Sequence, residues 1–382
     1  MISNNRSYNM KQNIVIILIL FSRFIYSLNW FVISPALPLI ASSGYMQKWM
    51  IGLIPLIFFL FTGLFQIPSG IVSNKLGAPA TFTAGLILLS LGNILLILYQ
   101  NFEWVLLTRA LSGFGAALFF ASAGAVLIEL KPDKPGFMMG MYNVAFALGG
   151  GAGLLWGVVH EMVGWKSGML IAGVSGIISA AIGYLPTHNN KNIGRFSVTD
   201  AINQLLDRNI LKVSLAFTGT WGAYFATGLL LPTYLQLELR QGLAISGTES
   251  TPLLFASIFG GLSAAIYDKI KRKKLLLLFS GLLSVLPASL FGFREGILII
   301  PALLTLGFFN EMAISICYAH ANYASPEKKA ASFAAMNTIQ ILIGMMLLPL
   351  VTWVALFSWF YAWIVMSLIG SLPLAFIIKL KE

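Results

Sequence analysis

Charged residues are scarce in this chain. Only 10% of its 382 residues are Asp, Glu, Lys or Arg, whereas 58% are hydrophobic. A water-soluble protein this apolar could not cover its surface with polar groups, so the composition excludes an ordinary soluble domain and indicates a chain embedded in a bilayer. Acidic residues are the scarcer kind: 13 Asp and Glu stand against 24 Lys and Arg, which gives a formal net charge of +11.

The residues that enzymes and metal sites need are also few. The chain has one cysteine, Cys317, and three scattered histidines. One cysteine excludes an internal disulfide, and the histidines show no ligand spacing. No phosphate-binding loop, dinucleotide fingerprint or Ser-His-Asp pattern is present, and no loop is long enough for a catalytic domain. We therefore expect no enzyme, no metal and no cofactor.

Long apolar runs are plentiful. Each run is long enough to cross a hydrocarbon core of about 30 Å as a helix, and no alternating barrel pattern is present. The twelve runs are approximately 14–39, 50–72, 79–99, 103–128, 136–159, 167–186, 209–236, 248–267, 274–293, 296–322, 330–352 and 356–378. The sequence predicts an all-α membrane protein with twelve transmembrane helices.

The basic residues are distributed unevenly between the loops. If the N-terminus is inside, the inner segments hold 18 of the 24 Lys and Arg, and the outer loops hold four. Positive charge favours the cytoplasmic side, so we predict a cell-membrane protein with both termini in the cytoplasm. A basic inner face beside anionic lipid explains the net charge without a nucleic acid.

The second half of the chain repeats the first at an offset of 194 residues. Pro132-Asp133-Lys134 falls on Pro326-Glu327-Lys328, and Asn143 falls on Asn337. In so apolar a chain this repeat predicts two related six-helix bundles, the architecture of secondary transporters with a binding site between the halves. We place the first bundle at 1–186 and the second at 209–382.

The segment 187–208 between the bundles begins polar and becomes amphipathic. Ser197 and Asp200 have the spacing of a helix-capping box, and one apolar helical face can be formed by Val198, Ala201, Ile202, Leu205 and Leu206. A short helix on the inner membrane surface and a flexible linker are both compatible with this pattern.

The loop after the second span carries a recognisable motif. Gly70, Asn74-Lys75 and Gly77 resemble the Gly-x-x-x-Asp-Arg-x-Gly loop of the major facilitator superfamily, with Asn74 in place of the acid. The repeat keeps Asp268-Lys269 and Arg272-Lys273 at the equivalent place. The resemblance covers essentially the whole chain. It implies gating by this set: Gly70, Asn74, Lys75, Gly77, Glu129, Asp268, Lys269 and Arg272.

Two further motifs resemble that family. Arg109 with Gly113 and Gly115 is similar to its Arg-x-x-x-Gly-x-Gly pattern in span four, which is associated with proton coupling. Gly149-Gly150 in span five is similar to its antiporter signature, with Gly150 where proline is usual. Small residues at this spacing also let helices pack closely, so packing and a moving hinge are both open.

Ionisable groups inside spans are costly and mark functional sites by default. Arg23 in span one, Arg109 in span four, and Glu311 and His320 in span ten are such groups. The resemblance implies that spans one, four, seven and ten line a central cavity.

Helical spacing assembles candidate residues around these charges. Ser27 and Trp30 follow Arg23 on one face, and Ser315 and Tyr318 follow Glu311 on another. The repeat places aromatic residues of span seven opposite. The predicted substrate-binding set is Arg23, Ser27, Trp30, Arg109, Trp221, Tyr224, Ser315 and Tyr318. Such a site suits an anion with some apolar or ring surface.

Glu311 and Arg109 are the predicted proton-coupling residues. A mid-span carboxyl buried without a partner favours its protonated form and can carry a proton, whereas a static pair with Arg109 or Arg23 is the alternative. Arg23 can instead extend to the headgroups, Arg109 can bond backbone carbonyls, and the Trp and Tyr stripes can be packing. For Glu129, an inner ion pair with Lys75 or Lys131 and simple solvation are both open.

These observations favour a secondary active transporter that moves a small organic anion by alternating access, powered by a proton or other ion gradient. Its expected partners are the substrate and the bilayer, and the resemblance implies a functional monomer. The alternatives are an efflux antiporter for hydrophobic compounds and a membrane sensor or scaffold that transports nothing.

Overall fold

The computed structural model describes residues 2–184, 197–263, 270–293, 296–324 and 329–380. Within these ranges the regular structure is helical throughout, with no strand, as the composition predicted. In the first half the helices are α1 (Ile2–Phe31), η1 (Ser34–Ala36), α2 (Leu37–Ser43), η2 (Lys48–Gly52), α3 (Leu53–Leu76), α4 (Ala78–Leu95), α5 (Phe102–Leu130), α6 (Pro135–Val163) and α7 (Trp165–Tyr184).

A short helix and a second set of membrane helices follow. They are α8 (Val198–Leu206), α9 (Arg208–Ala216), α10 (Thr218–Glu238), α11 (Leu243–Ser250), α12 (Pro252–Ser263), α13 (Lys273–Leu283), η4 (Leu286–Phe293), α14 (Gly296–Ala324), α15 (Lys329–Gly344), α16 (Leu347–Val354), α17 (Trp359–Ser371) and η6 (Leu372–Lys379).

Ten stretches of the described chain are helical, long enough and apolar enough to cross a bilayer. The other two of the twelve expected spans are divided in the structure. The seventh consists of α9 and α10, and the eighth consists of α11 and α12. The sequence did not indicate that these two would be divided, and residues 264–267 of the expected eighth span lie outside the described residues.

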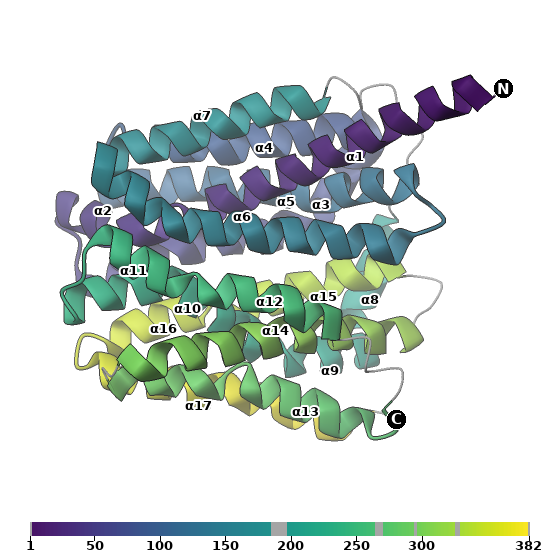
Figure 1. Ribbon diagram of the computed structural model, residues 1–382. Coiled ribbons are helices and arrows are strands. Elements are labelled where there is room, and N and C mark those ends of the chain that lie inside the picture. The colour runs from purple at the N-terminus through teal and green to yellow at the C-terminus, as the bar shows by residue number, and fades with distance from the viewer. Residues whose placement is uncertain (1, 185–196, 264–269, 294–295, 325–328, 381–382) are drawn as a thin grey trace.

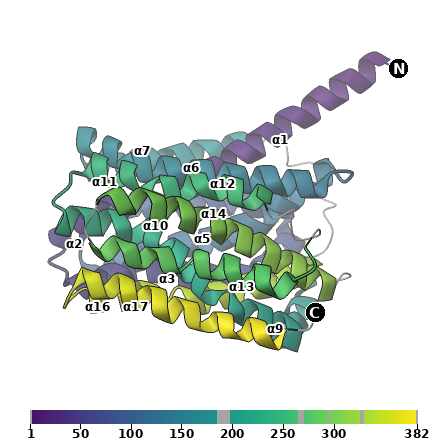
Figure 2. The ribbon, with the colours of Figure 1, turned by 60° about the horizontal axis from the view of Figure 1, so that its bottom comes forward.

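The helices lie side by side, with the first half in the upper part of Figure 1 and the second half in the lower part. Both chain ends and α8 lie at one end of the bundle, from which α1 projects (Figure 2), and α2 and α11 lie at the other. Following the predicted orientation, we call these the inner end and the outer end.

Proline interrupts the first span near its outer end. α1 ends at Phe31, and Pro35 lies within the short 3-10 helix that leads into α2. Proline has no backbone N–H and disfavours helical geometry at the preceding residue, so the α-helix cannot pass through it unchanged. This break leaves the backbone around Ser34 directed at the other half of the molecule.

Close helix packing is repeated in the two halves. A Cβ atom at Gly113 of α5 would lie 2.1 Å from the carbonyl oxygen of Phe58 in α3. At the repeat equivalent, Gly307 of α14, it would lie 2.0 Å from the carbonyl oxygen of Leu253 in α12. Only glycine allows such an approach of two backbones, so this glycine in the repeat is a packing requirement.

The two halves meet at residues that are equivalent in the repeat. The rings of Phe31 and Phe225, 194 positions apart, are stacked with centroids 6.1 Å apart. Ser34 Oγ lies 2.9 Å from the carbonyl oxygen of Gly228, which is also 194 positions away. Contacts between equivalent positions occur where a pseudo-twofold axis passes, so the axis that relates the halves runs through these pairs.

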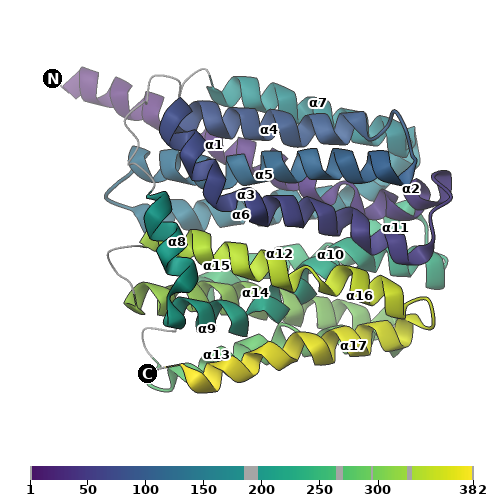
Figure 3. The ribbon, with the colours of Figure 1, turned by 180° about the vertical axis from the view of Figure 1, so that it is seen from behind.

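The connecting segment contains a helix that joins the two halves at the inner end. Its first turn is capped by Ser197 Oγ, which accepts a hydrogen bond from Asp200 N at 3.1 Å. Ala201 is fully buried against Ile67 of α3 and against α15. α8 crosses the inner ends of α3 and α15 in Figure 3. Residues 187–196 of the predicted linker lie outside the described residues.

Candidate functional site

The outer end of the seam between the halves is closed by polar contacts. Ser34 Oγ donates to the carbonyl oxygens of Gly228 and Leu229, and Gln236 Nε2 donates to the Pro35 oxygen, each at 2.9 Å. The backbone N–H of Ala244 donates to Glu161 Oε2 at 2.8 Å, and Thr352 Oγ1 donates to the Trp49 oxygen at 3.0 Å. Every one of these bonds joins one half to the other.

Aromatic rings fill the seam next to this closure. Trp30 of α1 makes edge contacts with Phe58, Phe59 and Phe146, with ring centroids 4.8, 5.4 and 5.5 Å away. Phe225 of α10 lies 6.0 Å from Trp30 and 4.9 Å from Phe59. The rings therefore come from both halves and form an apolar layer across the middle of the molecule.

Arg23 lies two helical turns from Trp30 along α1, toward the inner end. Its side chain is only 3% exposed. Four rings surround the guanidinium carbon, with centroid distances of 4.1 Å for Tyr142, 4.5 Å for Phe146, 4.8 Å for Tyr26 and 5.1 Å for Phe120. Ring faces attract a cation, so this cage stabilises the buried charge in part.

Several hydrogen-bond donors near the cage have no partner. Nε and Nη1 of Arg23 are buried without an acceptor, as are the Ser27 hydroxyl and the Trp30 indole N–H. These three residues lie on one face of α1 at spacings of four and three. A buried polar group without a partner is costly, and several on one face indicate a place for an acceptor-rich ligand.

The carboxyl group of Glu311 lies on the opposite half, on α14. Its Cγ would lie 3.2 Å from a Cβ at Gly261, so the side chain packs against α12. The charge that acts on this carboxyl is that of Arg23. Tyr224 and Tyr318 lie within electrostatic range of Glu311. Glu311 of the second half is thus within electrostatic range of Arg23 in the first half and of Tyr224 and Tyr318 in its own half.

The other predicted binding residues occupy the margins of this group. Tyr318 donates a hydrogen bond to Asn337 Oδ1 of α15, which is one of the residues that mark the repeat. Trp221 is stacked on Phe225, with centroids 5.2 Å apart, and its indole N–H has no partner. Ser315 is partly buried on α14.

Arg109 does not join Arg23. It is buried inside the first half, where Nη1 donates to Asn93 Oδ1 of α4 at 3.0 Å. Asn93 Nδ2 in turn donates to the side-chain and main-chain oxygens of Asn29, at 2.9 and 3.0 Å. Asn29 Nδ2 donates to the Ala172 oxygen of α7 at 3.1 Å. This network ties together α1, α4, α5 and α7.

The predicted gating residues separate into several environments. Gly70 is buried in α3, and Lys75 is exposed at its inner end. Gly77 has a φ of 84°, the left-handed region that favours glycine, and forms the turn into α4. Arg272 is exposed ahead of α13.

The sequence left two interpretations of Glu129 open, an inner ion pair and a solvated carboxylate. Glu129 is exposed, and in the described part of the chain it makes no ion pair with Lys75 or Lys131. The alternative, a solvated carboxylate, agrees with its exposure. Asp268 and Lys269 lie outside the described residues.

Sequence reasoning missed the cage around Arg23. Tyr142 and Phe146 are four residues apart on span five, which puts them on one helical face. That spacing was visible, but nothing in the sequence indicated that this face turns toward span one. Asn93, the partner of Arg109, was missed for the same reason.

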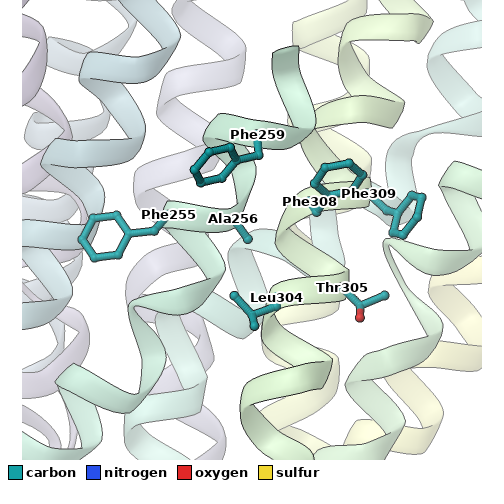
Figure 4. Close-up of a pocket in the computed structure, with 7 residues that line it drawn as sticks. All are labelled: Phe255, Ala256, Phe259, Leu304, Thr305, Phe308 and Phe309. Atoms are coloured by element: carbon teal, nitrogen blue, oxygen red, sulfur yellow. The ribbon is translucent and has the colours of Figure 1, made fainter. Parts of the chain in front are cut away.

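An apolar groove lies apart from these residues, between α12 and α14. Its lining is almost entirely hydrocarbon and aromatic, with one hydroxyl, as Figure 4 shows. The lining residues are Phe255, Ala256, Phe259, Leu304, Thr305, Phe308 and Phe309. None of the predicted binding residues lines it.

The residues that the structure describes include no group of three or more His, Cys, Asp or Glu side chains placed to hold a metal ion. The side chains around Arg23 and Glu311 offer one guanidinium, one carboxyl, hydroxyls and aromatic rings.

Comparison with known proteins identifies the class. Residues 19–349 match the Major Facilitator Superfamily, and the chain belongs to that family of membrane transporters. A solved structure of a bacterial homologue of the human lysosomal transporter Spinster, in an inward-facing and unoccupied conformation, superimposes with a TM-score of 0.78. At 16% identity, with 97% of this chain and 96% of that chain covered, this likeness shows the twelve-helix fold.

Two curated relatives are similar at the level of sequence. The "Probable nitrate transporter NarT" of Staphylococcus haemolyticus is 24% identical over 75% of this chain and 73% of its own length. The "Quinolone resistance protein NorA" of Staphylococcus aureus (strain MSSA476) is 24% identical over 60% of this chain. The match spans 55% of the length of NorA, which is less than two thirds.

Proposed function

We propose that this transporter moves a small organic anion across the cell membrane by alternating access and that a proton gradient drives it. The observation that supports this most directly is Arg23, a buried arginine in an aromatic cage with two nitrogens that have no hydrogen-bond partner, whose charge acts on Glu311 of the other half. Its working form is a monomer with both termini in the cytoplasm, and the ion gradient takes the place of a cofactor.

The anion assignment rests on the cost of the buried guanidinium. A charged side chain in the membrane interior needs a partner, and the four rings attract the guanidinium through their faces. The hydroxyls of Tyr26 and Tyr142 also interact with Arg23, yet its Nε and Nη1 have no acceptor. A carboxylate or another oxyanion would accept those hydrogen bonds and neutralise the charge. Ser27 and the Trp30 indole would donate to the same ligand, since they lie on the same face.

The proton assignment rests on the competition for Arg23. When ionised, Glu311 is the negative group that pairs electrostatically with Arg23, and it then competes with the substrate. Protonation removes that competition, so proton binding and anion binding favour each other. Because binding free energies are reciprocal, the same coupling lets a proton gradient drive the anion.

An efflux pump for hydrophobic compounds is the second candidate. The aromatic layer formed by Trp30, Phe59, Phe146 and Phe225 would suit a large apolar compound. The name of the relative NorA points the same way, whereas that of NarT points to an anion.

A ligand-stabilisation screen of the purified protein tests the proposal. We expect carboxylates or inorganic oxyanions to raise the melting temperature of the wild type. Arg23→Gln should abolish that rise and Arg23→Lys should reduce it, since lysine keeps the charge but not the planar donors.

Arg240→Gln is the matched control because Arg240 is exposed at the outer end. It should respond like the wild type. If Arg23→Gln retains the full anion response, Arg23 is not in the binding site. If hydrophobic cations stabilise the wild type and anions do not, the result favours efflux of hydrophobic compounds and contradicts anion transport.

A further inference from the structure

The connecting helix α8 has two faces with different surroundings. One face is buried: Ala201 packs against Ile67 of α3 and Ala331 and Ala334 of α15, and Gln204 Oε1 accepts a hydrogen bond from Ser332 Oγ at 2.9 Å. This face joins the first half to the second. It also fixes how α8 is rotated, so the position of the opposite face is determined.

The opposite face is apolar and uncovered. Ile202 and Leu206, one helical turn apart, are 48% and 76% exposed, so they do not share the buried face of Ala201 as the sequence predicted. Leu211 of α9 is also exposed. The described chain offers no segment packed over these side chains. In a soluble protein such side chains would be a liability, but at the end of a membrane bundle they have an apolar solvent within reach.

Basic residues lie next to this apolar face. Arg208 is exposed at the start of α9, and Lys212 follows it by one turn. Asp207, the acidic residue between α8 and α9, is occupied as a helix cap, because Oδ1 accepts from the N–H groups of Asn209 and Ile210 at 2.9 and 3.0 Å. Apolar side chains beside free cations match the chemistry of a membrane surface that contains anionic lipid.

The position of α8 agrees with that partner. It lies across the inner ends of α3 and α15, and both helices belong to stretches long and apolar enough to span a membrane (Figure 3). From these observations we propose that α8 docks its Ile202–Leu206 face into the inner leaflet, with Arg208 and Lys212 binding anionic headgroups. α8 then links the bilayer to the seam between the halves.

Fluorescence quenching in vesicles tests this docking. Two single variants, Leu206→Cys and Ile202→Cys, are each labelled with bimane. The native Cys317 is buried, and its own labelling is measured by treating the wild type with bimane in the same way. The proteins are reconstituted in phosphatidylcholine vesicles, with or without phosphatidylglycerol, that contain a headgroup nitroxide lipid. We expect a blue-shifted emission and strong quenching at both positions, greater with phosphatidylglycerol.

Asp133→Cys is the control, because Asp133 is exposed in the loop between α5 and α6. Its label should remain quenched weakly in both lipids. In the Leu206→Cys background, Arg208→Gln with Lys212→Gln should remove the phosphatidylglycerol-dependent part of the quenching.

Two results would overturn the proposal. Labels at 202 and 206 that are quenched no more than the label at 133 would mean that the face remains in water and is available to a soluble partner. Quenching that is unchanged by phosphatidylglycerol, or unaffected by loss of the two basic residues, would exclude recognition of anionic lipid.

Discussion

Arg23 and Arg109 are both buried arginines, yet their surroundings differ in kind. Arg23 lies among four rings and has two unpartnered nitrogens. Arg109 has the Asn93 side chain as an acceptor and Phe58 as a ring contact, 4.6 Å from its guanidinium carbon, and one of its nitrogens, Nε, is buried without a partner. The first arrangement leaves donors for a ligand, and the second holds helices together.

The Arg109 network makes a stability prediction. Asn93→Leu should lower the free energy of unfolding by about 1–3 kcal/mol, because it removes an acceptor from a buried charge and a donor from Asn29. Thermal unfolding in detergent measures the change. Ser90→Ala is the control one turn away; it removes a hydrogen bond within α4 and should cost less.

An Asn93→Leu protein that is as stable as Ser90→Ala would contradict this account of Arg109. The residue would then be available for the substrate or coupling role that its motif implies.

At the residue scale, the sequence predicts which charged side chains lie inside the membrane better than it predicts which side chains contact them. Intramembrane Arg and Glu are rare enough to be noticed singly, which is how Arg23, Arg109 and Glu311 were found. The rings around Arg23 come from α1, α5 and α6, and aromatic residues are common in this chain. The sequence therefore gives no reason to select the four aromatic residues that contact Arg23 from all the others.

Glycines determine how closely the helices of one half approach each other. In α6, a Cβ atom at Gly149 would lie 2.0 Å from the carbonyl oxygen of Phe24, the residue after Arg23. α1 must therefore move if Gly149 acquires a side chain. Gly149 thus positions the segment of α1 that carries the candidate site.

Gly149→Ala should destabilise the protein by about 1–3 kcal/mol through overpacking and should weaken anion binding by displacing Arg23. Gly140→Ala on the same helix is the matched control, since nothing lies within 4 Å of a Cβ there. Alanine at that position should be neutral or slightly stabilising. Melting temperatures with and without the anion measure both effects.

Equal melting temperatures for the two alanine variants would contradict the packing role of Gly149. Normal stability with lost anion binding would instead favour the hinge that the span-five motif suggests.

At the scale of elements, hydropathy predicted where the spans lie but not how they are broken. Pro35 has a local signal, because proline interrupts helices by a known mechanism. Another proline behaves differently: Pro232 lies inside the continuous helix α10. Tertiary packing decides whether a proline ends a helix or lies within a continuous one, and this packing cannot be predicted from the local sequence.

The whole molecule is a pair of related bundles with an asymmetric centre. The pairs Phe31–Phe225 and Ser34–Gly228 join equivalent positions at the pseudo-twofold axis. Beside the axis the symmetry ends: Arg23 is equivalent to Phe217, and Glu311 is equivalent to Ala117. One half therefore supplies the cation and the other half supplies the carboxyl.

The offset of 194 residues predicted two bundles, and the match to the family agrees with that architecture. It could not predict which faces of the bundles meet, because a repeat relates sequences and not surfaces. The positions where the repeat differs were the best sequence guide to the candidate site, since Arg23 and Glu311 are both such positions.

The central claim is that Glu311 and the anion compete for Arg23. The most direct test is the pH dependence of anion binding to wild type, Glu311→Gln and the control Glu129→Gln, whose carboxylate is exposed at the inner end. We predict that wild type and Glu129→Gln bind the anion more tightly as the pH falls, because protonation of Glu311 frees Arg23. Glu311→Gln should bind tightly at every pH, and in proteoliposomes a pH gradient should no longer drive its uptake. A Glu311→Gln protein that keeps the wild-type pH dependence in both measurements would contradict the account.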